Sequence, residues 1–117
     1  MEIILAENHG FCYGVKRAVE MANEAAEGKG KSYTLGPIIH NPQVVGRLES
    51  KGVSPIQEVA DIDEGTMIIR SHGVGPAIYA EAEEKGLHIL DATCPHVKKA
   101  QQDAKSVIED GMTLVIL

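Results

Sequence analysis

Short apolar runs alternate with helical segments along the whole chain, and this alternation is the feature that most constrains the fold. Strands are expected at residues 2–6, 32–36, 66–70, 87–90 and 112–117. The irregular stretch that follows the second helical segment leaves room for another short strand around Val53. Strands that alternate with helices of this length favour right-handed crossovers. The sequence therefore predicts an α/β fold, a three-layer αβα arrangement with a mostly parallel sheet.

Proline and glycine mark the ends of the expected helices. Pro42 and Pro76 fit the first helical position, because proline lacks the N–H group that the first turn leaves unpaired. Asn41 fits the N-cap before Pro42. Gly52 and Gly86 fit the position just past the end of each helix. These signals predict two well-delimited helices between strands.

The composition excludes several classes of protein. With 117 residues, 44% of them hydrophobic, the chain can bury a core. A net charge of -6 argues against nucleic acid or an anionic membrane as a partner. No apolar run approaches the roughly 18 residues of a membrane span, and the N-terminus lacks the basic region of a signal peptide. We therefore expect a cytoplasmic protein, in which two cysteines are more typical of ligands or catalysts than of a disulfide.

One thiol or imidazole follows each of the first four expected strands. These residues are Cys12, His40, His72 and Cys94. In an open parallel sheet the carboxyl ends of the strands meet at one edge, where ligands bind. The sequence therefore predicts that the four side chains face a common crevice.

The two cysteines also stand at expected helix starts. If Pro95 is the first helical residue, Cys94 is the N-cap, and the helix dipole there favours the thiolate form. Thiolates are the ligands of soft metals and of iron–sulfur clusters. Gly10 and Gly14 flank Cys12 and would let the backbone approach a bulky inorganic group. Cys12 is therefore interpreted as a ligand at a crevice.

His72 is followed by Gly73 and Gly75, a pattern that suits a phosphate resting on backbone amides. Taken singly, each cysteine or histidine is more often structural than functional, but their gathering at one edge favours a site. Two readings without redox catalysis stay open: a module that binds a phosphorylated ligand, and a Cys2His2 zinc site. Lys98 and Lys99 are interpreted as a solvated helix face.

Four stretches of the sequence resemble the N-terminal part of the 4-hydroxy-3-methylbut-2-enyl diphosphate reductase family. They are "GFCYGVKRAVEMA", "GPIIHNPQVVGRLESKGV", "IIRSHGVGP" and "LDATCPHVKKAQ". They come in the family's order and cover nearly the whole chain. A cysteine framed as G-F-C-x-G together with D-A-T-C-P is a highly specific combination.

The resemblance implies an oxidoreductase of the non-mevalonate route to isoprenoids. The family holds a [4Fe–4S] cluster with three cysteines, and Cys12 and Cys94 match the first two. His40 and His72 match histidines that bind the substrate's diphosphate. A ferredoxin or flavodoxin supplies electrons, the C–O bond breaks, and isopentenyl and dimethylallyl diphosphate form. The proton-donating glutamate of the family lies beyond the point that matches Leu117, so no catalytic residue is expected within this chain.

The resemblance also implies a domain organisation. The family has three similar α/β domains around a central cluster. Residues 1–95 match the first domain, although the strand at 2–6 pairs with the last domain in the family. Residues 96–117 match the opening helix and strand of the second domain. The chain is therefore expected to be incomplete and, alone, inactive.

Overall fold

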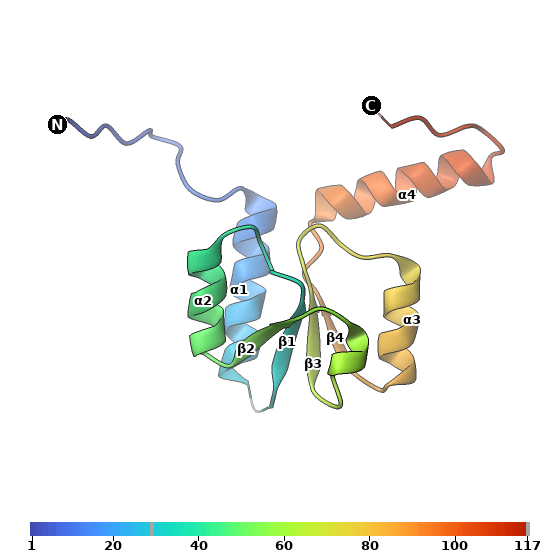
Figure 1. Cartoon of the computed structure of the whole chain (residues 1–117). Helices are drawn as coiled ribbons and strands as arrows, with labels where there is room; N and C mark the ends of the chain where they lie inside the picture. Colours follow the sequence, from blue (N-terminus) through green and yellow to red (C-terminus); the bar gives the residue numbers. More distant parts are fainter. Residues whose placement is uncertain (29, 117) are drawn as a thin grey trace.

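The structure, a computed structural model, describes residues 1–28 and 30–116 and contains a small parallel sheet flanked by helices (Figure 1). In chain order the elements are α1 (Tyr13–Glu27), β1 (Ser32–Leu35), α2 (Pro42–Ser50), β2 (Val53–Ile56), the 3-10 turn η1 (Val59–Asp61), β3 (Thr66–Ile69), α3 (Pro76–Glu84), β4 (His88–Asp91) and α4 (Pro95–Glu109). The expected α/β class is confirmed, and so is the short strand around Val53.

The sheet has the strand order β2-β1-β3-β4, and each neighbouring pair is parallel. From β1 the chain moves outward to β2, then crosses back to β3 and continues to β4 on the other side. The direction of winding therefore reverses between β1 and β3. In open parallel sheets the loops at such a reversal point diverge and leave a crevice at the carboxyl ends of the strands.

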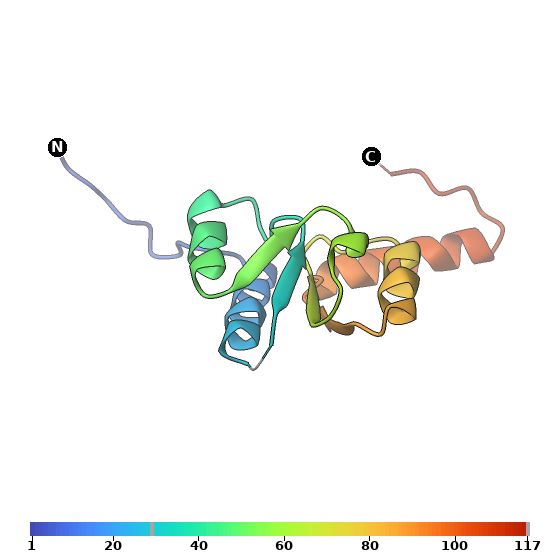
Figure 2. The same ribbon diagram turned by 60° about the horizontal axis from the view of Figure 1, so that its bottom comes forward.

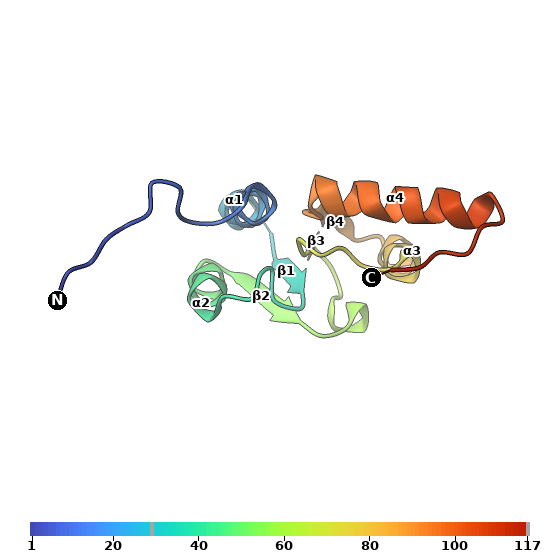
Figure 3. The ribbon, with the colours of Figure 1, turned by 90° about the horizontal axis from the view of Figure 1, so that it is seen from above.

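Helices α1 and α2 lie on one side of the sheet and α3 and η1 on the other (Figure 3). Two apolar clusters fill the space between these helices and the sheet. On one face α1 and α2 cover Val53 and Ile68. On the other face α3 and η1 cover Met67 and Ile69. Successive residues of β3 thus serve opposite faces, as the period of a strand requires. The predicted three-layer arrangement is confirmed.

The helix ends follow the local signals in the sequence. Pro42 and Pro76 occupy the first helical positions of α2 and α3. The Asn41 side chain accepts hydrogen bonds from the backbone N–H groups at positions 43 and 44. Gly52 and Gly86, just past the two helices, have φ values of 91° and 69°, which glycine adopts without strain.

The two ends of the chain do not form the strands expected at 2–6 and 112–117. Residues 1–6 and 112–116 are extended without ladder hydrogen bonds, and residue 117 lies outside the described residues. A strand needs a neighbour for its backbone groups, and the described part of the chain brings none to either segment. Ile4 and Ile116 are each 83% exposed.

Both ends extend away from the sheet on opposite sides (Figure 2). The radius of gyration is 16.7 Å, against about 13 Å for a compact domain of this length. None of the residues described in α4 is buried. The helix contacts the rest of the chain near its start, through Lys98 and Gln101.

Replacement of Ile68 tests the packing of the sheet against α1 and α2. Ile68 has no exposed surface, so we expect Ile68→Ala to lower the free energy of unfolding of the 117-residue chain by about 2–5 kcal/mol. Ile108 on α4 is 60% exposed, and Ile108→Ala should change that free energy by less than about 0.5 kcal/mol. Urea unfolding followed by circular dichroism measures both. Equal losses in the two variants would contradict this assignment of the core.

Candidate functional site

His40 and His72 lie next to each other at the carboxyl edge of the sheet. His40 belongs to the loop between β1 and α2, and His72 to the loop between β3 and α3. Because β1 and β3 are hydrogen-bonded neighbours, their following loops run side by side. The two ring centroids are 5.0 Å apart and the ring planes are inclined by 44°. The predicted juxtaposition of the two imidazoles is therefore present in the structure.

Both rings line a hollow of about 260 Å³. The residues around it come from the start of α1 and from the loops after β1 and β3: Phe11, Val15, Ile39, His40, Asn41, Ser71 and His72. Both histidines are exposed. Their ring nitrogens can therefore meet a ligand from solvent, and an imidazole can donate hydrogen bonds to an anion.

The two cysteines occupy equivalent positions on two helices. Cys12 is the N-cap of α1 and Cys94 is the N-cap of α4. Within the described structure neither side chain makes a capping hydrogen bond, so both thiols are free for another partner. Cys12 is exposed and Cys94 is partly buried. Helices α1 and α4 both begin at the upper edge of the sheet in Figure 1.

Cys94 packs against the first turn of the helix that Cys12 caps. A Cβ atom on Gly14 would lie 2.5 Å from Sγ and 2.9 Å from Cβ of Cys94. Arg17 of α1 donates from Nη1 to the carbonyl oxygen of Thr93 at 3.3 Å. The start of α1 and the loop before α4 are therefore in direct contact, and the two thiols lie at one rim.

Backbone atoms connect Cys94 to the loop that carries His72. The Cys94 N–H donates to the carbonyl oxygen of Ser71 at 2.9 Å. The next loop residue, Gly73, has a φ of 77°, and a Cβ there would lie 3.0 Å from both Gln101 Nε2 and Thr93 Cγ2. The loop after β3 can therefore approach the loop after β4 only with glycine at position 73.

The structure brings all four predicted residues to the carboxyl edge of the sheet. The prediction that Cys12 follows a strand was wrong, because the segment before it is extended but does not pair with a neighbouring strand. Among the described residues no three His, Cys, Asp or Glu side chains are grouped closely enough to hold a metal ion.

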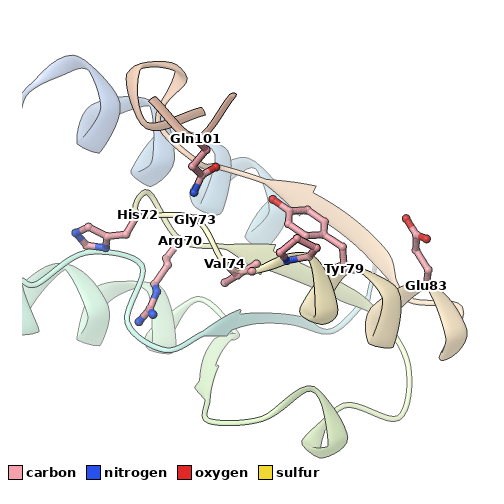
Figure 4. Close-up of a pocket in the computed structure, with 9 residues that line it drawn as sticks. Arg70, His72, Gly73, Val74, Tyr79, Glu83 and Gln101 are labelled. Carbon is pink, nitrogen blue, oxygen red and sulfur yellow. The ribbon is translucent and has the colours of Figure 1, made fainter. Parts of the chain in front are cut away.

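A larger hollow of about 860 Å³ lies beside His72 (Figure 4). His72 stands at one end and Glu83 at the other, and Gln101 reaches toward Gly73 from α4. Arg70 also lines it. The Arg70 Nη1 atom lies 3.0 Å from where a Cβ on Gly36 would be, and its Nε is buried without a hydrogen-bond partner among the described residues. No pattern in the sequence distinguished Arg70.

The interpretation of Lys98 as part of a solvated face was wrong. Its Nζ lies 2.6 Å from Oδ2 of Asp91 at the end of β4. Asp91 also accepts from the Tyr79 hydroxyl at 3.0 Å and from the Thr93 N–H at 2.9 Å. Partial burial raises the pKa of Asp91, but the hydrogen bonds from Lys98, Thr93 and Tyr79 outweigh it and lower the pKa to about 2.

Lys99 behaves as the sequence suggested. It lies on the exposed side of α4 and forms an ion pair with Asp103 at 2.7 Å, one turn along the same helix. The sequence does not show which of the two lysines faces the sheet, because that depends on the direction in which α4 leaves β4. The one signal for Asp91 was its position immediately after an expected strand and shortly before an expected helix start.

The family model described as "LytB protein" matches residues 3–117. The chain belongs to this family. Curated relatives named 4-hydroxy-3-methylbut-2-enyl diphosphate reductase match over all 117 residues, with 54% identity in Geotalea uraniireducens and 55% in Geobacter sulfurreducens. The chain spans 42% of the length of these relatives.

Solved structures of such reductases share the fold of this LytB chain. One, described as (E)-4-hydroxy-3-methyl-but-2-enyl diphosphate reductase, the terminal enzyme of the non-mevalonate pathway, has a TM-score of 0.81 and 50% identity. The match covers 93% of this chain and 39% of that one. The reductase from Plasmodium falciparum has a TM-score of 0.84 and 34% identity over 89% of this chain and 33% of its own. The resemblance noted in the sequence is confirmed. None of the described helices is both long and apolar enough to span a membrane.

Gly14→Ala tests the contact between Cys94 and α1. Rotation of the thiol alone cannot relieve the clash, because Cβ of Cys94 is also too close. We expect the free energy of unfolding of the 117-residue chain to fall by about 1–3 kcal/mol. Gly46 in α2 is the matched control, since a Cβ there meets nothing within 4 Å. Gly46→Ala should raise the same free energy by about 0.5–1 kcal/mol. A Gly14→Ala chain as stable as the Gly46→Ala chain in urea would refute the contact.

Proposed function

We propose that this chain is part of an iron–sulfur reductase that converts (E)-4-hydroxy-3-methylbut-2-enyl diphosphate into isopentenyl and dimethylallyl diphosphate, the last step of the non-mevalonate pathway. The proposal depends on one observation. In a chain of the LytB family, two cysteine thiols that make no capping hydrogen bond and two neighbouring imidazoles lie at the same edge of the sheet. We assign residues 1–95 to a first domain and 96–117 to the opening of a second. Because the chain spans 42% of its relatives, the activity is assigned to the complete gene product.

The two thiols suit an iron–sulfur cluster. Cys12 and Cys94 stand at helix N-termini, where the positive end of the dipole stabilises thiolate ligands. The described residues include no third ligand beside them, so other residues would complete the coordination of a [4Fe–4S] cluster. Such a cluster would supply electrons, delivered by a ferredoxin or flavodoxin, and a Lewis-acidic iron for the leaving hydroxyl.

The paired histidines suit the diphosphate. His40 and His72 face one hollow, and their ring N–H groups can donate to phosphate oxygens from two loops at once. Helix α2 adds little, because Asn41 already occupies the first N–H groups of that helix. Helix α3 has Gly75 as its N-cap and no side-chain cap in the described structure. Pro76 has no N–H group and the Ile78 N–H donates to the Gly75 carbonyl oxygen, so in the first turn the Ala77 N–H is the group left for an anion near His72.

Serine replacements test the cluster. In the complete gene product, purified without oxygen and reconstituted with iron and sulfide, we expect Cys12→Ser and Cys94→Ser each to lower cluster content and reductase activity with a reduced dye by about 100-fold, because a ligand is lost. Iron, zinc and sulfide analysis and the visible absorption of the cluster measure the first effect. His88→Gln, at the amino end of β4, is the control. Full iron content in both cysteine variants would contradict the proposal.

Asparagine replacements test the diphosphate site separately. Each of His40→Asn and His72→Asn shortens the side chain, so that the bond from the ring N–H to a charged oxygen is lost at a cost of about 1.5–3 kcal/mol. We therefore expect KM for the substrate, and the inhibition constant of inorganic diphosphate, to rise by about 10- to 100-fold with iron content unchanged. His88→Asn serves as the control. Diphosphate binding that survives both cysteine replacements, in a protein that never acquires a cluster, would instead support a binding module for phosphorylated ligands.

A further inference from the structure

The carboxylate of Asp91 connects three elements at the point where α4 leaves the sheet. It terminates β4, accepts a hydrogen bond from Tyr79 of α3, and forms an ion pair with Lys98 of α4. Figure 4 shows the Tyr79 ring between α3 and the pale orange strand β4. The same carboxylate accepts from the Thr93 N–H. One side chain therefore fixes the turn before Cys94 and the helical turn after it.

These contacts add to the Cys94 N–H bond to the Ser71 carbonyl oxygen and to the packing of Cys94 against Gly14, which also hold the start of α4. None of its described residues is buried, so apolar packing does not set its direction. Lys98 Nζ approaches Asp91 to 2.6 Å, and the Asp91 side chain is only 22% exposed. Cys94, the N-cap, lies between Asp91 and Lys98 along the chain. The ion pair therefore links the end of β4 to the first turn of α4 across the residue that carries the thiol.

The neighbouring ion pair on α4 has no such effect. Lys99 and Asp103 are one turn apart on the same helix, and their side chains are 73% and 63% exposed. An exposed pair within one helix contributes little to stability and does not orient the helix relative to the sheet. Both are Lys–Asp ion pairs, but Lys98–Asp91 joins α4 to β4, whereas Lys99–Asp103 joins two turns of α4.

We propose that Asp91 is a positioning residue for Cys94: its bonds to Lys98, Tyr79 and the Thr93 N–H set where the Cys94 thiol stands relative to Cys12. The inference rests on the proposed function, in which Cys94 is a cluster ligand. Groups that orient a metal ligand from behind typically change metal retention when they are removed. Asp91 acts here on the backbone at the helix start and does not touch the ligand atom.

The experiment uses the complete gene product reconstituted with iron and sulfide. Asp91→Asn keeps the size of the side chain but removes its charge, and Lys98→Met keeps the aliphatic stem. Asp103→Asn and Lys99→Met are the matched controls. The measurements are the rate of cluster loss to the chelator EDTA well below the unfolding midpoint, the electron paramagnetic resonance spectrum of the reduced cluster, and the unfolding midpoint itself.

We expect Asp91→Asn and Lys98→Met each to lose the cluster about 10-fold faster than the parent, with a changed resonance spectrum. The double variant should be no worse than either single one, because both remove one ion pair. Asp103→Asn and Lys99→Met should show the same rate of cluster loss and the same resonance spectrum as the parent. If Asp91→Asn does not fold, the half-exposed Lys98 position decides the question by the same measurements.

Two failures remain distinguishable. If Asp91→Asn and Lys98→Met lower only the unfolding midpoint, and their chelator rates and spectra equal those of Asp103→Asn and Lys99→Met, the positioning role is overturned. The proposed function survives that result as long as Cys94→Ser loses the cluster. If Cys94→Ser retains the cluster, the proposed function is overturned, and the positioning role with it.

Discussion

The hydrogen-bonded pairing of β1 with β3 is the constraint on which the rest of this structure depends. It joins two strands whose following crossovers diverge, toward β2 on one side and β4 on the other. The loops after these strands therefore start side by side and leave a crevice between them. His40 and His72 come from these two loops, so their 5.0 Å separation follows directly from the strand order.

Close approach of backbones then gathers the rest of the rim. Gly14 lets Cys94 lie against the first turn of α1, and Gly73 lets the loop after β3 pass beneath Gln101. A backbone hydrogen bond from Cys94 to Ser71 joins the loops after β4 and β3. The positions of the thiols and imidazoles thus depend on glycines that have no reactive side chain. Both kinds of residue occur in the same sequence motifs.

Local signals in the sequence were sufficient to place the helices and the four strands of the sheet along the chain, but not to predict the strand order in the sheet. Proline and glycine marked the ends of α2 and α3 because they act through the backbone of their own turn. Apolar runs alone did not predict the structure of residues 2–6 and 112–116 correctly. A strand also needs a neighbouring strand to pair with, and hydropathy does not show whether one is present. The Asp91–Lys98 pair was missed for a similar reason. A lysine on an amphipathic helix is predicted to face solvent unless the direction of that helix relative to the sheet is known.

The cap at Asn41 has a consequence for selectivity at the rim. Pro42 has no N–H group, and the Asn41 side chain accepts from the N–H groups of Gln43 and Val44. The donors that would make the start of α2 a general receptor for any anion are thus consumed inside the protein. An anion held here as we propose is therefore selected by side chains such as that of His40, and not by the peptide groups at the start of α2.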